Sequence, residues 1–572
     1  MTAIPTTKQP ANQRPYATAL DLAARYPQAA ISLFTVLCLL PFVGKAVHLD
    51  DPLFLWAAQQ IVKHPLNPFG FQVVWYAYRM PMSEVTQNPP LASYYAALIG
   101  SVAGWSELAL HIGFMVPAVG VTLGTYRLAM RFTHRPLIGA ACTILAPGFL
   151  VSATGLMCDV MMLALWLWAG VLWMEGLDES GKPLYLAVSG ILIAACALTK
   201  YFGMSLIPLL LVYSLVRKRG VGAWISYLLI PIALLIGYEL WTRALYGHGL
   251  LLGAFSYTGM ARGLVREQIT RSGQALVGLA FAGGCMLPAL TFAPLVWSRR
   301  QILAGAILSL GLGFAFFQGW INLGTYYASQ AWAQQHLAAV STQLVFYLAG
   351  GISVLALAIT DLWKKKDAAS LFLFLWVLGT LFFAIFLNWV VTARSILPLI
   401  PPAAILLARR LDEVRLPFAT SRRRLALITP LLLSGIVSLW VTAGDTALAN
   451  SARTIANYIH QKTRDQSSAV WFQGHWGFQY YMQAFGARPL EIGTHIVNAG
   501  DLIVIPKNNV NIFPLSLQTT EEGTTDVDVH SWAATMSQQL GAGFYFSGWG
   551  PLPFTFGPVP HQRYYVLRVA QP

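Results

Sequence analysis

Long apolar stretches alternate with short polar stretches over most of the chain. Runs of this length predict helices that cross a membrane, and thirteen of them precede residue 442. A further short apolar run at 91–103 is predicted to lie in the membrane interface. We therefore expect a polytopic α-helical membrane protein. The predicted spans cover residues 29–47, 108–130, 137–151, 160–174, 184–198, 204–216, 223–241, 275–297, 302–321, 343–363, 371–386, 396–408 and 425–441.

The pattern changes at about residue 443, where polar residues become common and the apolar runs become short. Residues 450–462 have the spacing of an amphipathic helix, and three short segments, 468–472, 501–506 and 564–569, are typical of strands. This pattern predicts a small soluble α/β domain outside the membrane. The predicted parts of the chain are a cytoplasmic tail at 1–28, a membrane module at 29–442 with an external loop at 48–90, and an extracytoplasmic domain at 443–572.

The charge of the chain fits this arrangement. Of 572 residues, 56% are hydrophobic and only 10% are charged, whereas soluble domains carry roughly 25% charged residues. Lys and Arg outnumber Asp and Glu by 37 to 23, and the basic clusters follow the second, sixth, eighth, tenth and twelfth spans. Because short cytoplasmic loops are enriched in Lys and Arg, the N-terminus is predicted inside and the C-terminal domain outside. The excess of Lys and Arg is therefore explained by the orientation of the chain in the cytoplasmic (inner) membrane. Binding to nucleic acid is not expected.

The five cysteines all lie in or at the ends of apolar runs and lack metal-ligand spacing. They therefore argue against a disulfide framework and against a structural zinc site. They are Cys38, Cys142, Cys158, Cys196 and Cys285.

Several charged and polar residues fall at the predicted external ends of the spans. Ionisable groups at membrane depth are costly and usually functional. Taken alone, the acidic pair Asp50-Asp51 would be a solvated helix end. Its predicted neighbourhood favours a functional interpretation, because carboxylates and cations converge on one face at headgroup level. The other members of this group are Glu84, Asn88, Asp159, Lys200 and Arg394.

The order of these residues resembles the GT-C class of membrane glycosyltransferases, over roughly residues 29–410. The resemblance is to the group that contains protein O-mannosyltransferases and the bacterial aminoarabinose transferase of lipid A. Each motif alone is weak, whereas the ordered set on one predicted side is moderately specific. The set consists of the acidic pair, Asn88-Pro89-Pro90-Leu91, Cys158-Asp159-Val160, Leu198-Thr199-Lys200-Tyr201-Phe202-Gly203, and Ala393-Arg394-Ser395-Ile396-Leu397-Pro398 followed by Pro401.

The resemblance implies inverting transfer of a hexose or pentose from a polyprenyl-phosphate-linked donor on the outer face. A sugar hydroxyl is a poor nucleophile until a carboxylate accepts its proton, which suits Asp50 as the base with Asp51 as its neighbour or substitute. The departing phosphate gathers negative charge, which nearby cations would stabilise. The predicted phosphate-binding residues are Lys200, Arg394 and Arg271. The predicted substrate-binding residues are Glu84, Asn88 and Asp159.

Two features depart from the pattern of the group. The acidic pair is Asp-Asp where many relatives have Asp-Glu, and Asn88 stands where the aminoarabinose enzyme has Lys. That enzyme also places Glu and His on a metal. Glu84 matches in position, and His248 is the candidate histidine after the seventh span. A lone loop histidine is more often only a polar residue, so no cofactor is certain and a divalent metal is left open.

Two further groups of residues have alternative interpretations. Arg262, Arg266 and Arg271, in the loop after the seventh span, suit either phosphate binding or anchoring to anionic lipid headgroups. The Gln473-Gly474-His475-Trp476-Gly477 segment suits either sugar stacking or a buried strand-to-helix turn, and we favour the turn.

A transporter or flippase of a lipid-linked saccharide is the alternative function. It predicts inverted repeats and broken helices at the midplane, but the chain shows no repeat and its ionisable residues lie at the outer face. A third hypothesis is a binding or assembly protein, and such a protein would not need the acidic pair or Lys200. The acceptor of an enzyme, whether protein, lipid or polysaccharide, is not determined by these motifs.

Overall fold

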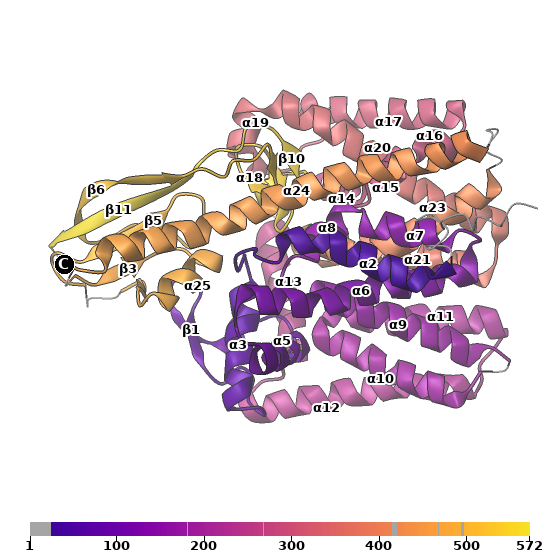
Figure 1. Ribbon diagram of the computed structural model, residues 1–572, viewed down its shortest axis with the longest axis horizontal. Coiled ribbons are helices and arrows are strands. Elements are labelled where there is room, and N and C mark those ends of the chain that lie inside the picture. Colours follow the sequence, from indigo (N-terminus) through magenta and orange to yellow (C-terminus); the bar gives the residue numbers. More distant parts are fainter. Residues whose placement is uncertain are drawn as a thin grey trace, which may run out of the picture.

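The computed structural model describes residues 25–179, 181–266, 268–414, 420–466, 468–493 and 497–571. Residues 1–24 of the predicted tail therefore lie outside the described part. The fold has two parts, a bundle of helices and a smaller C-terminal region built on a β-sheet at one end of the bundle (Figure 1).

Eight helices in the described part of the chain are long and apolar enough to cross a membrane. All eight correspond to predicted spans. An α-helix rises about 1.5 Å per residue, so roughly 20 residues are enough to cross the hydrocarbon core. The eight are α6 (Glu107–Phe132), α9 (Asp159–Leu177), η2 with α11 (Tyr201–Lys218), η3 with α12 (Ala223–Tyr246), α17 (Arg299–Phe317), α20 (Leu337–Lys365), α21 with η4 (Ala368–Leu387), and α24 from Leu425 to Thr463.

The other five predicted spans are helical but shorter or interrupted. The first is α2 (Pro27–Leu39) with η1 (Leu40–Phe42), and the fifth is α10 (Pro183–Thr199). Prolines accompany the breaks in the remaining three, because proline lacks the N–H that an uninterrupted helix needs. These three are α7 (Pro136–Ile144) with α8 (Pro147–Ser152), α14 (Arg271–Cys285) with α15 (Pro288–Thr291) and α16 (Ala293–Val296), and α22 (Ala393–Ile396) with η5 (Leu397–Leu399) and α23 (Ile400–Glu413).

The predicted external loop at 48–90 is folded rather than irregular. It contains α3 (Asp51–Lys63), a hairpin of β1 (Gln72–Val74) and β2 (Arg79–Pro81), and α4 (Met82–Val85). Helix α3 was not predicted, although Phe54, Leu55, Ala58 and Ile61 recur on one buried face of it. The short run predicted at the interface is helix α5 (Leu91–Ala103).

Helix α24 (Thr420–Thr463) connects the two parts of the fold. It runs through the predicted domain boundary at 442/443, and the predicted amphipathic helix at 450–462 is its last part. Figure 1 shows it leaving the bundle and continuing alongside the sheet. The division of the chain into domains stays a prediction, because one uninterrupted helix belongs to both sides of it.

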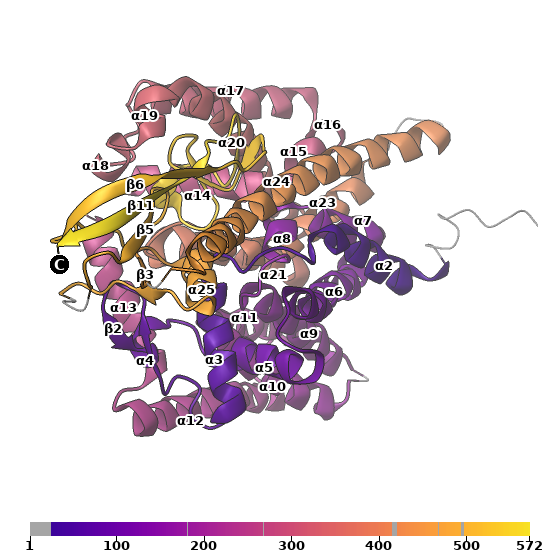
Figure 2. The ribbon, with the colours of Figure 1, turned by 60° about the vertical axis from the view of Figure 1, so that its left-hand side comes forward.

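The C-terminal sheet has five strands in the order β4-β3-β5-β11-β6. Strand β3 is parallel to β4 and β5, whereas β11 is antiparallel to β5 and β6. The three predicted strands are confirmed as β3, β5 and β11, but β6 was missed because its sequence is almost entirely polar. Helix α25 (Trp476–Ala484) packs beside the end of α24 (Figure 2). The five strands are β3 (Val470–Phe472), β4 (Arg488–Pro489), β5 (Leu502–Pro506), β6 (Gln518–Val527) and β11 (Gln562–Gln571).

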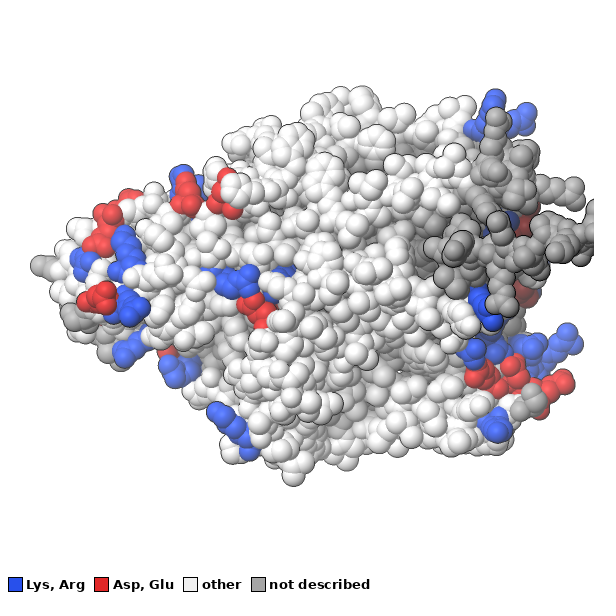
Figure 3. Space-filling view, viewed as in Figure 1, with Lys and Arg blue, Asp and Glu red and all other residues white. Residues whose placement is uncertain are grey.

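The surface of the bundle is apolar between two charged ends. In Figure 3, Lys, Arg, Asp and Glu gather mainly at the two ends of the long axis, with a broad, largely uncharged band between them. Large hydrophobic side chains such as Leu240 on α12 and Ile307 on α17 are well exposed in the bundle. A helix face of this kind is stable in contact with lipid, so the multi-pass membrane fold predicted from the sequence is confirmed.

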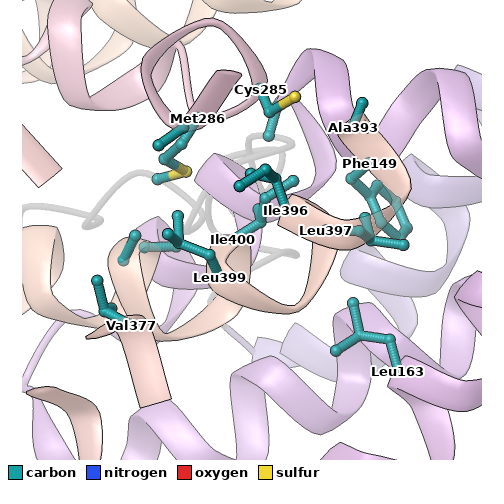
Figure 4. Close-up of a cluster of buried hydrophobic side chains, with 14 of the residues drawn as sticks. Phe149, Leu163, Cys285, Met286, Val377, Ala393, Ile396, Leu397, Leu399 and Ile400 are labelled. Carbon is teal, nitrogen blue, oxygen red and sulfur yellow. The ribbon is translucent and has the colours of Figure 1, made fainter. Parts of the chain in front are cut away.

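The hydrophobic core continues beneath the segment that carries Arg394. Ala393 and Ile396 of α22, and Leu397 of η5, are completely buried. They pack in one cluster with Phe149 of α8 and Cys285 of α14 (Figure 4). Side chains in close-packed cores have little freedom, so this packing fixes the backbone on either side of Arg394.

Candidate active site

The two aspartates of the acidic pair occupy different environments. Leu49, just before the pair, has a left-handed φ of 44°, which is unusual for a leucine and turns the chain sharply. The Asp51 side chain is fully buried and accepts hydrogen bonds from the backbone N–H groups of His48 and Leu156, each at 2.9 Å. Burial raises the pKa of Asp51 to about 7. Asp50, by contrast, keeps 32% of its side-chain surface exposed.

Asp50 forms an ion pair with Arg394. Its Oδ2 atom lies 3.0 Å from Nη2 of the guanidinium. The backbone of Arg394 is fixed by helix α22, which begins with a capping box between Thr392 and Ser395. The other guanidinium nitrogen, Nη1, lies 2.7 Å from Sδ of Met157. Two of the residues predicted from distant motifs are therefore in direct contact.

Asp159 and Lys200 form a second ion pair beside the first. Asp159 begins α9 and is buried, whereas Lys200 follows the last residue of α10 and is partly exposed. The Asp159 carboxylate also attracts the Arg394 guanidinium electrostatically. Asn88 joins the group through its Oδ1, which lies 3.6 Å from the Cys158 thiol. The structure thus brings together five of the predicted site residues.

A cavity of about 560 Å³ opens beside Lys200. It lies between helix α13 (Leu250–Arg266), η2 and η4 (Phe383–Leu387), and most of its surface is apolar. Two cations, Lys200 and Arg262, line it. An apolar cavity with a few placed polar groups is the usual form of a small-molecule site. Its other lining residues are Gln87, Asn88, Tyr201, Phe202, Met204, Ser205, Ala254, Phe255, Thr258, Gly259, Phe383, Leu387 and Asn388.

Arg271 lies elsewhere. It is the first residue of α14, its side chain is exposed, and it does not line the cavity. Arg262, another arginine of the same predicted loop, lines the cavity, and the phosphate-binding role of Arg271 stays a prediction. The sequence could not separate these arginines, because both fall in the same polar stretch, and only the direction of α13 brings Arg262 inward. The side chain of Arg266 lies outside the described part of the structure.

Glu84 and His248 line a separate cavity of about 280 Å³. A metal ion held by protein side chains needs at least three such ligands in most sites. No cluster of three or more His, Cys, Asp or Glu side chains occurs among the described residues. The residues around Glu84 and His248 therefore do not fit a metal centre, and no step of the chemistry is assigned to one.

A buried ion pair behind the acidic pair was not predicted. Nζ of Lys45 lies 2.5 Å from Oδ2 of Asp445, and both side chains are at most 1% exposed. Lys45 also donates a hydrogen bond to Thr154, and Asp445 accepts hydrogen bonds from the hydroxyls of Thr535 and Tyr545. A lysine inside the first predicted span and an aspartate just after the last were the available signals. Charges at these depths are rare unless they are paired.

The Gln473–Gly477 segment is the turn between β3 and α25, as favoured from the sequence. The His475 ring stacks on Trp75 of the external loop with centroids 4.5 Å apart. Burial lowers the pKa of His475 to about 4, so the ring is neutral at pH 7. A Cβ on Gly477 would lie 2.0 Å from the Val47 carbonyl oxygen, so only glycine fits this contact. This turn therefore holds the C-terminal region against the chain that leads to Asp50.

One protein-family model matches part of the sequence. It is described as dolichyl-phosphate-mannose-protein mannosyltransferase, and it covers residues 87–241. The predicted resemblance to this glycosyltransferase group is confirmed. The matched stretch includes Asn88, Asp159 and Lys200, and it ends before α13 and the segment of Arg394. No curated protein sequence matches the chain.

Solved membrane glycosyltransferases are similar at low sequence identity. The archaeal oligosaccharyltransferase AglB from Archaeoglobus fulgidus, in complex with an inhibitory peptide and a dolichol-phosphate, has 12% identity and a TM-score of 0.48, with 82% of this chain and 65% of that one covered. ArnT from Cupriavidus metallidurans, bound to undecaprenyl phosphate, has 14% identity and a TM-score of 0.41, with 85% and 93% covered. The chain thus spans less than two thirds of the length of the archaeal structure.

Proposed function

We propose that the chain is a glycosyltransferase that moves a hexose or pentose from a polyprenyl-phosphate donor to an acceptor hydroxyl. The observation that carries this proposal is the apolar cavity lined by Lys200, which pairs with Asp159 beside the Arg394–Asp50 pair. An isoprenoid chain needs an apolar surface, and its phosphate needs cations. The description of the matching family model names a donor of the same chemical class.

Lys200, Arg262 and Arg394 are the proposed phosphate-binding residues. Lys200 and Arg262 line the cavity. Arg394 is attracted electrostatically to Asp159, the carboxylate that pairs with Lys200. Charge-assisted hydrogen bonds to phosphate are about twice as strong as neutral ones. As the bond between the sugar and the phosphate breaks, these cations stabilise the negative charge that collects on the leaving oxygen.

Asp50 is the proposed base. Its carboxylate accepts the proton of the acceptor hydroxyl while the hydroxyl oxygen attacks the anomeric carbon. The bond to the phosphate oxygen breaks, and polyprenyl phosphate leaves with the electron pair. Attack from the side opposite the phosphate inverts the anomeric carbon. Asp51 is unsuited to this role because its two oxygens are buried and already bound to backbone N–H groups.

The Arg394 guanidinium is shared between the proposed base and the proposed leaving group. It pairs with Asp50. A bound donor phosphate competes for the same guanidinium and loosens its hold on the carboxylate. Asp50 is then freer to accept a proton when a sugar is in place to react.

The proposed location is the outer face of the cytoplasmic membrane, with the C-terminal region extracytoplasmic. The distribution of Lys and Arg supports this orientation. Membrane lipid, the donor and an acceptor protein, lipid or polysaccharide are the proposed partners. Glu84 is retained as a proposed acceptor-side residue, since its cavity shares Gln87 and Ala254 with the donor cavity.

The test uses the purified full chain in lipid nanodiscs, with polyprenyl-phosphate sugars as donor and an envelope extract as the source of acceptor hydroxyls, both prepared from its native host. The enzyme is expected to release free polyprenyl phosphate, and Asp50→Asn to slow this release about 10²- to 10⁴-fold. A matched control is Asp465→Asn, which changes an aspartate outside the site. Binding or movement of the lipid without cleavage of the sugar–phosphate bond would refute the proposal and favour a transporter or a binding protein.

A further inference from the structure

Tyr545, in the C-terminal region, contacts the same guanidinium as Asp50. The Arg394 Cζ atom lies 5.9 Å from the centroid of the Tyr545 ring, within the range of a cation–π interaction. The Tyr545 side chain is buried. Arg394 is therefore held by a carboxylate through one of its nitrogens and by an aromatic ring from the C-terminal region.

The hydroxyl end of Tyr545 is anchored in the buried network behind the site. It donates a hydrogen bond of 2.9 Å to Oδ2 of Asp445, which is also paired with Lys45. The His48 ring meets the Tyr545 ring edge-on at 5.4 Å. These contacts fix both the position and the tilt of the ring, since the hydroxyl cannot move without leaving the Asp445 carboxylate with fewer donors.

The backbone around Tyr545 is joined to the backbone around Arg394. The N–H of Ala393 donates to the carbonyl of Phe544 at 2.7 Å, and the N–H of Ser547 donates to the carbonyl of Val391 at 3.0 Å. These bonds lie on either side of Tyr545 and directly before Arg394. The ring and the guanidinium are thus placed by direct bonds between neighbouring residues, not only by the general packing of the core.

We propose that Tyr545 is a positioning residue that aims Arg394 at the donor phosphate, so that the C-terminal region completes the donor site. The inference rests on the proposed function. A ring face leaves the N–H groups at the edge of a guanidinium free to bind, whereas a second carboxylate there would compete with the phosphate. Tyr545 therefore restrains Arg394 without occupying the donors that phosphate needs.

The chain offers a matched control in Tyr347 of α20. Like Tyr545 it is a buried tyrosine, its hydroxyl donates to the backbone carbonyl of Phe554, and its ring packs edge-on at 5.0 Å against the same residue. Both tyrosines thus bind the C-terminal region to the rest of the molecule. They differ in that Arg394 lies over the ring of Tyr545 alone.

The experiment measures the Kd of undecaprenyl phosphate for the full chain in nanodiscs, together with thermal stability. Tyr545→Leu is expected to weaken binding about three- to tenfold, because the cation–π contact is partly desolvated, whereas Tyr347→Leu lowers stability but leaves the Kd within about twofold. Tyr545→Phe keeps the ring and restores most of the binding. In an Arg394→Gln background, Tyr545→Leu is expected to have no further effect on the Kd, because the two residues act as a unit.

Three results would overturn the inference. Tyr545→Leu leaves the Kd unchanged, or the two leucine variants weaken binding equally, or Tyr545→Leu has the same effect with and without Arg394. If Tyr545→Leu does not fold, loss of binding in Tyr545→His relative to Tyr545→Phe decides the question, since both keep a ring but only the imidazole offers a poor cation–π face. A wild-type chain that does not bind undecaprenyl phosphate refutes this inference together with the proposed function.

Discussion

The Asp50 carboxylate and the Arg394 guanidinium are 344 residues apart in the chain and 3.0 Å apart in the structure. This pair separates the roles of the two adjacent aspartates. Asp50 faces the Arg394 guanidinium, the proposed partner of the donor phosphate, whereas Asp51 accepts hydrogen bonds from backbone N–H groups.

The first prediction follows from that separation. Asp50→Asn is expected to lower the turnover rate by about 10²- to 10⁴-fold, the usual contribution of a general base, without loss of thermal stability. Asp51→Asn is expected to lower stability more than turnover, since the amide nitrogen that replaces one carboxylate oxygen cannot accept the backbone hydrogen bond made there. Steady-state release of polyprenyl phosphate and thermal unfolding of both variants check this. Equal turnover in the Asp50 variant and the wild type would exclude Asp50 as the base.

The raised pKa of Asp51 gives a prediction about pH. Its ordinary value of 3.8 applies to the unfolded chain, and its folded value is about 7, so the folded state holds the proton over the interval between them. Stability therefore falls as the pH rises from about 4 to about 7, by up to about 1.4 kcal/mol per unit. Asp51→Asn removes this slope.

Thermal unfolding of the wild type and Asp51→Asn at several pH values isolates the effect of Asp51. Burial lowers the pKa of His48 and of His475 to about 4. These two histidines therefore have the opposite effect, because they lower the stability as the pH falls below about 6.5. Both histidines are present in both proteins, so their contribution cancels in the difference. A difference that does not depend on pH would show that Asp51 is ionised at pH 5.

The spans and part of the site could be predicted from the sequence for a simple reason. Apolar length is a local property, and helix ends place polar residues such as Asp159 and Lys200 at a common depth. The pairing of Asp50 with Arg394, and the position of Arg262 rather than Arg271 at the cavity, depend on which helices lie side by side. That information is spread over contacts hundreds of residues apart in the chain.

The folded external loop was missed for a different reason. Helix α3 is short, and the polar residues Gln59, Gln60 and Lys63 near its end interrupt the apolar pattern of the stretch. Strand β6 also lacks an apolar pattern, because it pairs through its backbone with β11 and needs no apolar side chains for that pairing. Tertiary contacts therefore decide the structure of both segments, and local composition does not.

The cavity predicts which cations bind the donor. Lys200→Ala and Arg262→Ala are each expected to weaken undecaprenyl phosphate binding about 10- to 100-fold, because each removes a charged hydrogen-bond donor worth about 1.5–3 kcal/mol. Arg271→Ala serves as the matched control, with an arginine at the start of α14 that does not line the cavity. Titration of nanodisc-embedded protein with the lipid measures all three. Weaker binding in Arg271→Ala than in Arg262→Ala would reverse the assignment.

Loss of one charge of the Lys45–Asp445 pair is expected to lower the stability strongly, and loss of both charges is expected to restore most of it. Asp445→Leu leaves the Lys45 ammonium buried without a counter-charge, which costs about 3–5 kcal/mol. The double variant Lys45→Met with Asp445→Leu removes both charges, and it is expected to recover most of the lost stability because replacing a buried pair with apolar side chains is often neutral. Denaturant unfolding of the wild type, both single variants and the double variant measures the coupling. If the losses of stability in the two single variants simply add in the double variant, the two charges do not stabilise one another.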